Sequence, residues 1–312
     1  MTILQLFIDL AQDYTPDISH TFIHFGHESV EDHGAPLQFK NARLIAKGNS
    51  SVYKGRLCRV GFKSRRMVCK IVSRSAKAVE RLKNEAQLYT KELKILQGVH
   101  VPSFFGLYMG QVDGCIAACI LFEDGGVPLD DDVSAYPEEF RISVMQSLMC
   151  IHKCGVQHGD FDTSNIVVDD AKNPKRHMII DFDNATYHQC QRSGEVFLYE
   201  IGPPAFADFK CSELWWVGQE LDIWTPSDIM FQGIGVPLRL VNGPEDVLDY
   251  VKKRHWNSPA PQNHMTLARN AIIDYANRYG DRVDYMMGRK VRALEPMVDA
   301  QVIDFMKPKG DA

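Results

Sequence analysis

Apolar and polar positions in the middle of the chain predict two short strands joined by a turn. Residues 166–168 form an apolar run, residues 169–174 are rich in Asp, Asn and Pro, and residues 177–180 return to a largely apolar run. Short apolar runs bounded by turn residues are typical of paired strands. We therefore expect a hairpin here, which places the residues before its first strand and after its second strand at the same edge.

Four other stretches carry apolar residues at helical spacing. The first predicts an amphipathic helix over residues 78–96, and Pro137 starts a second helix for which Gly155 is a suitable cap. Two more helices are expected in the tail, one around residues 247–251 and one closed by Gly280. The positions that define the four helices are Val79, Leu82, Ala86, Tyr89 and Leu93, then Phe140, Val144, Leu148 and Ile151, then Val247, Leu248 and Val251, then Leu267, Ala271, Tyr275 and Tyr279.

Acidic and amide residues flank the predicted hairpin. Asp160 and Asn165 precede its first strand and Asp181 follows its second, so the hairpin would bring all three to one pocket. Phosphoryl transfer needs groups of these kinds: an Asp that accepts the proton of the attacking hydroxyl, and an Asn and a second Asp that hold metal beside the phosphates. An ordinary polar loop followed by a hairpin is the alternative interpretation of the same residues.

Residues 158–165, His-Gly-Asp-Phe-Asp-Thr-Ser-Asn, and residues 179–182, Ile-Ile-Asp-Phe, resemble the catalytic centre of the protein-kinase-like superfamily. The His-Gly-Asp form is similar to atypical kinases and small-molecule phosphotransferases, and the chain also resembles predicted fungal proteins with a protein-kinase-like domain. The resemblance implies ATP and Mg²⁺ as cofactors, Asp160 as the catalytic base, and Asn165 and Asp181 as metal ligands.

Residues 67–72, Met-Val-Cys-Lys-Ile-Val, resemble the kinase strand that carries a phosphate-binding lysine. The resemblance implies that Lys70 is catalytic and contacts the α- and β-phosphates, with an anionic partner that keeps its ammonium in place. Glu85, on the helix predicted after this strand, is the expected partner. Glu80 and Glu92 on the same helix are the alternatives.

Two further segments resemble the parts of a kinase that surround the nucleotide. Residues 44–55 resemble the glycine-rich loop, although the chain has Asn and Ser where the family usually has further glycines. Residues 119–126 resemble the hinge between the lobes, where main-chain groups bind adenine. The nucleotide-binding residues implied by the resemblance are Gly48, Val52, Lys70, Glu85, Phe122, Glu123 and Asp124.

The order of these parts predicts an α+β, two-lobed protein-kinase-like fold with a small, β-rich lobe that carries one helix and a larger, mainly helical lobe. A chain of 312 residues with 45% hydrophobic content is long enough to bury a core in both lobes. We expect residues 41–124 to form the small lobe and residues 125–312 the larger one, which diverges from the family after about residue 210. Residues 1–40 are an N-terminal extension that either packs on the small lobe or binds a partner.

Several positions depart from the family pattern. Asp162 stands where protein kinases usually have Lys, and a transferring phosphate would repel its carboxylate. Asp183 replaces a Gly and should restrict the backbone, and Gly159 replaces an Arg that binds a phosphorylated activation loop, so control by that phosphorylation is not expected. Residues 184–209 contain no Ala-Pro-Glu triplet, and Glu213 is a candidate for its glutamate.

The leading hypothesis is an ATP-dependent kinase that transfers the γ-phosphate to a protein Ser or Thr hydroxyl, with the acceptor unidentified. One alternative is a small-molecule kinase of the aminoglycoside or choline type. Another is a pseudokinase that binds nucleotide or a partner without transfer. Asp162, Asp183 and the glycine-poor loop favour the pseudokinase, whereas the full set of catalytic residues argues against it.

Charge and hydropathy exclude some classes of partner. A formal net charge of -5 argues against nucleic acid, because phosphate backbones are bound by clustered Lys and Arg. The chain contains no uninterrupted apolar stretch long enough for a membrane span, so no membrane partner is expected. The apolar start lacks a basic leader and is interrupted by Asp9, so no signal peptide is expected.

The eight cysteines are scattered through predicted strands and helices, which suits a reduced cytoplasmic or nuclear environment. Two pairs have a spacing of four residues, Cys115 with Cys119 and Cys150 with Cys154, and the second pair lies near His152. These pairs are either part of a zinc site or small buried side chains.

Overall fold

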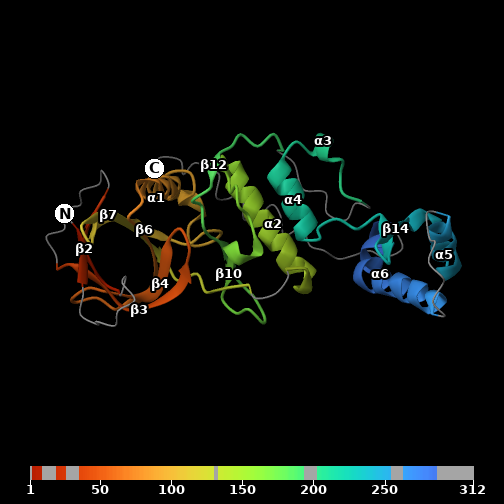
Figure 1. The fold of residues 1–312 in the computed structure, drawn as a ribbon, viewed down its shortest axis with the longest axis horizontal. Helices are drawn as coiled ribbons and strands as arrows, with labels where there is room; N and C mark the ends of the chain where they lie inside the picture. Colours follow the sequence, from red (N-terminus) through yellow and green to blue (C-terminus); the bar gives the residue numbers. More distant parts are fainter. Residues whose placement is uncertain are drawn as a thin grey trace, which may run out of the picture. The chain divides into compact units, whose positions relative to one another are not determined.

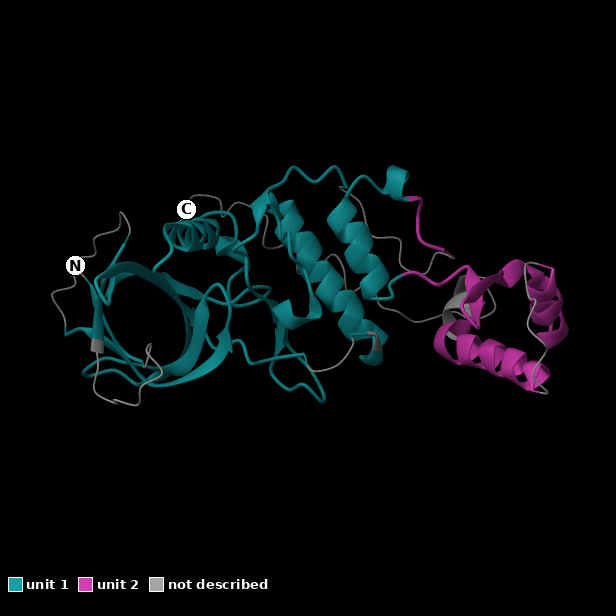
Figure 2. Cartoon of the chain, in the orientation of Figure 1, with its two compact units in different colours: residues 1–194, 206–223 teal, residues 195–205, 224–312 magenta. Residues whose placement is uncertain are grey.

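The computed structural model describes residues 2–8, 19–25, 35–129, 133–192, 202–253 and 263–286. The chain forms two compact units, residues 1–194 with 206–223 and residues 195–205 with 224–312 (Figure 1 and Figure 2). Residues 193–201, in the interval that should hold an activation segment, and residues 287–312 of the expected larger lobe lie outside the described residues.

The first unit begins with a seven-stranded sheet that closes into a barrel (Figure 1). Neighbouring strands are antiparallel in the order β1-β2-β6-β7-β5-β4-β3, and a parallel pairing of β1 with β3 closes the ring. The strands are β1 (Ile3–Phe7), β2 (Ser19–His24), β3 (Leu37–Lys47), β4 (Ser51–Cys58), β5 (Arg65–Ser73), β6 (Phe104–Val112) and β7 (Cys115–Glu123). The sequence did not predict this closure, because β1 and β2 come from the expected N-terminal extension and residue 40 lies inside β3.

Side chains alternate between the barrel interior and its outer face, and this alternation decides where Lys70 lies. Met67, Cys69 and Ile71 of β5 belong to the buried interior core, so Lys70 projects to the opposite face. Val52 of β4 is opposite Lys70 in the register and shares that outer face. Helix α1 (Ala76–Thr90) packs against this side of β5, β6 and β7.

Helix α1 buries the apolar face that the sequence predicted, with Val79, Leu82, Ala86 and Tyr89 among its buried residues. The Ser75 hydroxyl caps its start by accepting a hydrogen bond from the Ala78 amide at 3.2 Å. The helix ends at Thr90, earlier than predicted, and residues Lys94–Leu96 form a 3₁₀ turn instead. Leu93, which precedes this turn, and Leu96 within it are both buried, which explains why the apolar spacing continues past the helix end.

The rest of the first unit is organised around α2 (Glu138–Lys153), which contacts β9, β11 and α4. The predicted hairpin is confirmed, because β10 pairs with β11 in antiparallel register and the short strand β8 pairs with the other edge of β10. The remaining elements are β8 (Val127–Pro128), β9 (Val156–Gln157), β10 (Ile166–Val168), β11 (His177–Ile179), β12 (Thr186–Tyr187), α3 (Phe206–Phe209), α4 (Ser212–Glu220) and 3₁₀ turns at Val133–Ala135 and Thr163–Asn165.

The Ser147 hydroxyl of α2 contacts two histidines, one of which, His177, lies in β11 of this hairpin. The Ser147 hydroxyl of α2 lies 2.7 Å from His177 Nε2 and 2.8 Å from His100 Nδ1. Burial lowers the pKa of His177 to about 4, and the neighbouring His100 adds to the shift. The neutral imidazole is therefore the form that the folded chain stabilises.

Acidification is expected to destabilise the fold through His177. The unfolded imidazole titrates near 6.5 and the folded one near 4, so the unfolded chain binds more protons between these values, and stability falls as the pH falls. The loss from this residue should be about 2 kcal/mol between pH 7 and pH 5. His177→Gln, which does not titrate, should lose less stability over the same range. Thermal unfolding of both proteins at the two pH values measures the difference, and equal losses would contradict the assignment.

The second unit contains a β-hairpin and two helices around a separate apolar core. Its elements are β13 (Asp228–Phe231), β14 (Ile234–Pro237), a 3₁₀ turn at Leu238–Leu240, α5 (Pro244–Lys252) and α6 (His264–Met286). The two tail helices are confirmed, but the expected end at Gly280 is wrong, because α6 continues through it to Met286. The sequence did not predict the hairpin, whose turn uses positive φ angles at Gln232 and Gly233.

In the part of the chain that the structure describes, no helix is both long and apolar enough to span a membrane.

Candidate active site

A buried ion pair joins the barrel to α1. The ammonium of Lys70 lies 2.8 Å from Glu85 Oε2, and both side chains are almost fully removed from solvent. Burial lowers the pKa of Lys70, but the carboxylates of Glu85, Asp181 and Asp183 outweigh it and raise the pKa above its ordinary value. Burial raises the pKa of Glu85, and the charge of Lys70 opposes that shift.

The two alternative partners of Lys70 lie elsewhere. Glu80 forms an ion pair with Lys83 one turn further along α1, at 2.7 Å. Glu92 follows the end of α1 and no contact of it with Lys70 is observed. The structure therefore brings Glu85, rather than Glu80 or Glu92, to the lysine.

Asp181 and Phe182 meet this pair from the far end of the hairpin. The Asp181 carboxylate lies 2.5 Å from the Lys70 ammonium, and the Phe182 amide donates a hydrogen bond to Glu85 Oε1 at 3.2 Å. The buried Phe182 ring packs against the rings of Tyr89 on α1 and His158. Asp181 has φ of 71°, a left-handed conformation that costs energy for a residue with a side chain. Such strained residues are often found at functional sites.

Asp160 and Asn165 lie in the loop before β10. The Asn165 amide nitrogen donates to the Asp160 carbonyl at 2.8 Å, which closes the loop on itself. The Asn165 carbonyl accepts from the Ile180 amide at 2.9 Å, so Asn165 is bonded to the residue next to Asp181. Asn184 donates to Asp160 Oδ2 at 3.1 Å and orients that carboxylate. The hairpin thus brings the two predicted metal ligands and the predicted base into one region.

Glu213 accepts hydrogen bonds from this loop, a role that sequence analysis did not predict. Its carboxylate accepts hydrogen bonds from the amides of Gly159 at 2.6 Å and His158 at 3.0 Å, and it contacts His152 Nε2 at 2.5 Å. Burial raises the pKa of Glu213, but the hydrogen bonds from His152 and the two amides outweigh it and hold the pKa below its ordinary value. No sequence spacing links Glu213 to a loop more than fifty residues away, so only the fold reveals the contact.

Gly159 explains the His-Gly-Asp form of the loop. Its φ is +80°, and a Cβ atom at this position would lie 2.5 Å from the Asn184 carbonyl oxygen. Neither the backbone angle nor the space admits a side chain without movement. The Arg that many protein kinases carry here would therefore displace the segment that orients Asp160.

Gly159→Ala is expected to destabilise the chain by about 1–3 kcal/mol, because it combines a left-handed backbone with a close contact to Asn184. Thermal unfolding measures the loss. The matched control is Gly48→Ala, where a Cβ would meet no atom within 4 Å and no positive φ is imposed. If the two variants lost equal stability, the proposed constraint at Gly159 would be absent.

The two acidic departures from the family pattern have local structural roles. Asp162 caps the 3₁₀ turn at Thr163–Asn165 by accepting a hydrogen bond from the Ser164 amide at 2.8 Å, and this amide and the Ser164 hydroxyl lower the pKa of Asp162. Asp183 lies 4.0 Å from the Lys70 ammonium. The φ angle of Asp183 is not positive, so this conformation of the chain does not need a glycine there.

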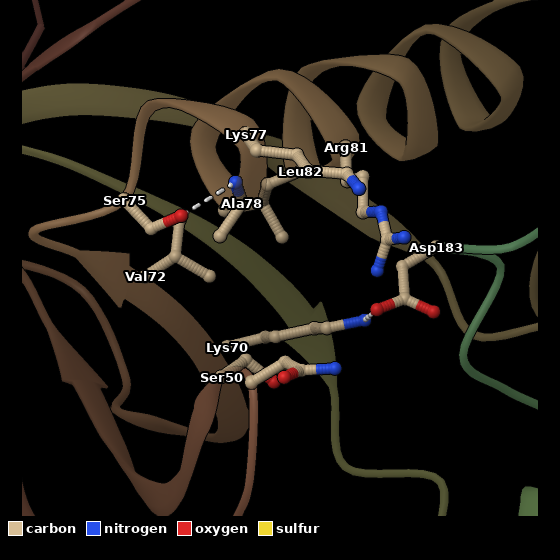
Figure 3. A pocket seen from close by; sticks show the side chains of 10 residues that line it. Ser50, Lys70, Val72, Ser75, Lys77, Ala78, Arg81, Leu82 and Asp183 are labelled. Atoms are coloured by element: carbon tan, nitrogen blue, oxygen red, sulfur yellow. Dashed lines mark hydrogen bonds and ion pairs between the residues drawn. The ribbon is translucent and has the colours of Figure 1, made fainter.

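A cavity of about 280 Å³ opens between the turn after β3, Lys70 and the first turns of α1 (Figure 3). Asn49 and Ser50 line it from the turn, next to Gly48. The cations Lys70, Lys77 and Arg81 face it, and Figure 3 shows Asp183 and Lys70 directed toward one another. Burial raises the pKa of Asp183, and Lys70 opposes the shift. The cavity is suited to an anionic group because cations and a helix N-terminus border it.

The expected hinge residues lie at the end of β7, outside the lining of this cavity. The Phe122 ring packs against Tyr89 and Phe104 in the interior. The Glu123 carboxylate accepts hydrogen bonds from Ser103 and Arg176, at 2.5 and 2.9 Å.

Main-chain and side-chain groups around the hinge are also engaged. The Glu123 amide donates to the Ser103 carbonyl at 2.9 Å. Asp124 forms an ion pair with Lys54 at 2.7 Å. Contact with adenine through Phe122, Glu123 and Asp124 is not tested by these observations and stays a prediction.

Comparisons with known proteins give a structural likeness only. No protein-family model matches the chain. No curated protein matches it either. Among solved structures, the chain is similar to the structure of vaccinia related kinase 3, with 14% sequence identity and a TM-score of 0.40 over 80% of this chain and 89% of the other. A structural likeness with so low a TM-score has no bearing on the activity of this chain.

Proposed function

We propose that this chain is an ATP-dependent phosphotransferase of the protein-kinase-like superfamily. The observation that carries the proposal is the buried Lys70–Glu85 pair, which holds the Lys70 ammonium 2.5 Å from Asp181. Kinases need a lysine on the phosphates, held by a helix glutamate, beside a metal-binding aspartate. Three side chains that are distant in the sequence meet here in the arrangement that this chemistry requires.

The residues fit Mg²⁺ and phosphates by their chemistry. Mg²⁺ prefers oxygen ligands, and Asp181 and Asn165 offer a carboxylate and an amide oxygen. The Asn165 nitrogen is the atom bonded to Asp160, which leaves its oxygen as the ligand atom. When bound, Mg²⁺ neutralises the charge that develops on the phosphates.

The side chains of this site would share the reaction as follows. Lys70 would bind the α- and β-phosphates, and Val52, which shares its face of the barrel, would contact adenine. Asp160 would accept the proton of the acceptor hydroxyl. The hydroxyl oxygen would bond to the γ-phosphorus while the bond between that phosphorus and the ADP oxygen breaks. Asn184 and Glu213 would position the loop that carries Asp160.

We further propose a protein Ser or Thr hydroxyl as the acceptor, with a small-molecule hydroxyl as the alternative. Asp162 favours a pseudokinase only if its carboxylate has no role other than to repel a phosphate. Its role as the cap of a 3₁₀ turn gives Asp162 a structural reason to be there, which supports an active enzyme.

Transfer of labelled γ-phosphate from Mg-ATP, to the chain itself and to a generic basic protein, tests the proposal, together with Mg-ATP binding by calorimetry. Binding with transfer to protein supports a protein kinase. Binding of Mg-ATP without transfer to protein, to aminoglycosides or to choline indicates a pseudokinase. No binding of Mg-ATP would overturn the proposal.

A further inference from the structure

Two histidines and two cysteines meet in the first unit, apart from the proposed phosphotransfer residues. One ligand atom from each lies within 4.8 Å of those from the other three. Two of the residues are buried and two are half-buried. The members of this His–Cys cluster are His152, His188, Cys190 and Cys211. The sequence pointed to a potential zinc site near His152 alone, and neither predicted cysteine pair belongs to the cluster.

The topology of the unit brings the four residues together from three elements. His152 lies in the last turn of α2, and Cys211 is the residue that precedes α4. Strand β12 pairs with β9, directly after α2, and His188 follows β12 with its amide bonded to the Gly155 carbonyl at 2.8 Å. Cys190 lies two residues further. The cluster therefore joins the end of α2, the segment after β12 and the start of α4.

Two distances within the cluster, both from Cys211, suit a tetrahedral ion. Cys211 Sγ lies 3.6 Å from His152 Nδ1 and 3.8 Å from His188 Nε2. With Zn–S of about 2.3 Å and Zn–N of about 2.0–2.1 Å, tetrahedral geometry places sulfur and nitrogen ligands roughly 3.6 Å apart. Both measured separations agree with that value to within a few tenths of an ångström.

The surroundings of His152 are those of a metal-bound histidine. Its Nε2 donates to Glu213 Oε2 at 2.5 Å, so in the neutral ring Nδ1 carries the lone pair, and Nδ1 is the atom directed at Cys211. Histidine ligands of metals usually donate their other ring N–H to a carboxylate, a main-chain carbonyl or a water, which fixes the tautomer and the ring orientation. A Cys₂His₂ set with four protein ligands is typical of closed structural zinc sites.

We propose that the His–Cys cluster binds one Zn²⁺ as a structural site. The ion would fix the His152 ring, and through it the Glu213 carboxylate that accepts hydrogen bonds from Gly159 and His158. The site would thereby stabilise the loop that carries Asp160. This role does not depend on whether the chain transfers phosphate.

Metal analysis of the purified full chain tests the proposal. We expect stoichiometric Zn²⁺ in the wild-type chain and a loss of at least about tenfold in affinity in Cys190→Ser and Cys211→Ser. Replacement of Zn²⁺ by Co²⁺ should give the sulfur-to-metal charge-transfer absorption and the visible bands of a tetrahedral thiolate site. Cys58→Ser is the matched control, since it removes a half-buried thiol at the end of β4, and it should retain wild-type metal content.

Glu213→Gln provides a second measurement that does not remove a ligand. Loss of the carboxylate partner of His152 should weaken Zn²⁺ binding by roughly 10- to 100-fold, measured by competition with a chromophoric chelator. Cys190 is half-buried, so Cys190→Ser should fold even if Cys211→Ser does not.

Three outcomes would overturn the proposal. One is a folded wild-type chain that neither contains Zn²⁺ nor binds added Zn²⁺ or Co²⁺. Another is a disulfide between Cys190 and Cys211 in the purified chain. The third is a Zn²⁺ affinity that Cys190→Ser leaves unchanged, since the ion would then lie elsewhere.

Discussion

The Asp160→Asn variant is expected to lose about 10²- to 10⁴-fold in phosphoryl transfer, the usual contribution of a general base. Asn has nearly the shape of Asp and can still accept the hydrogen bond from Asn184, but it cannot take the proton of the acceptor hydroxyl. The Asp160 main chain, which receives the bond from Asn165, is unchanged. Mg-ATP affinity should therefore equal that of the wild-type chain, because the proposed phosphate and metal ligands are elsewhere.

Single-turnover transfer of labelled γ-phosphate and calorimetric titration with Mg-ATP measure the two quantities. The matched control is Asp162→Asn, two residues away. Asn also caps turns of this kind, so the bond from the Ser164 amide should persist and most of the activity should remain. Equal activity of Asp160→Asn and the wild-type chain would refute Asp160 as the base. A loss in Asp162→Asn as large as in Asp160→Asn would give that carboxylate a role beyond capping.

Lys70→Met is expected to destabilise the chain by about 3–5 kcal/mol, because it leaves the carboxylate of Glu85 buried without its cation. The Phe182 amide remains as a partner of Glu85, but one neutral donor does not replace an ammonium. Mg-ATP affinity should fall by roughly 10- to 100-fold, since a charged hydrogen bond to phosphate is lost. This loss of binding distinguishes Lys70→Met from Asp160→Asn.

A double-mutant cycle separates the two effects of Lys70→Met. In Lys70→Met/Glu85→Gln no uncompensated charge is buried at the pair, so stability should recover by a large part of the loss, whereas Mg-ATP affinity should stay low. Lys77→Met is the control for stability, because Lys77 lines the same cavity but is exposed, and it should change stability by no more than about 0.5 kcal/mol. If stability and affinity recovered together in the double mutant, the affinity loss would be a consequence of unfolding and Lys70 would have no separate role in binding.

The local parts of the site could be predicted because their signals lie within a few residues. The apolar run and turn around residues 166–180 predicted the hairpin that the structure contains. The structure adds two local patterns that were not part of the prediction: period-two alternation in β5 places Lys70 on the face opposite Cys69 and Ile71, and helical spacing places Glu85 on the buried side of α1. Both patterns follow from the backbone geometry of strands and helices, which repeats over short distances.

Predictions about element ends and irregular segments were weaker. The helix expected to reach residue 96 ends at Thr90, because a 3₁₀ turn buries the last apolar residues equally well. Gly280 was expected to close a helix, yet glycine only permits a helix to end, and here α6 continues. The hairpin of β13 and β14 lies in a tail that was expected to be helical. In each case the local sequence is compatible with two backbone conformations.

The sequence alone determined the order of the candidate site residues along the chain and the hairpin that separates Asp160 and Asn165 from Asp181. Only the tertiary structure decided that β1 pairs with β3 to close the barrel, that Glu213 holds the loop before Asp160, and that the His–Cys cluster forms. These contacts join residues far apart in the chain, and no short-range periodicity encodes which distant groups meet. They form because burial of the barrel and α2 cores fixes the segments in space and thereby brings their side chains within bonding distance.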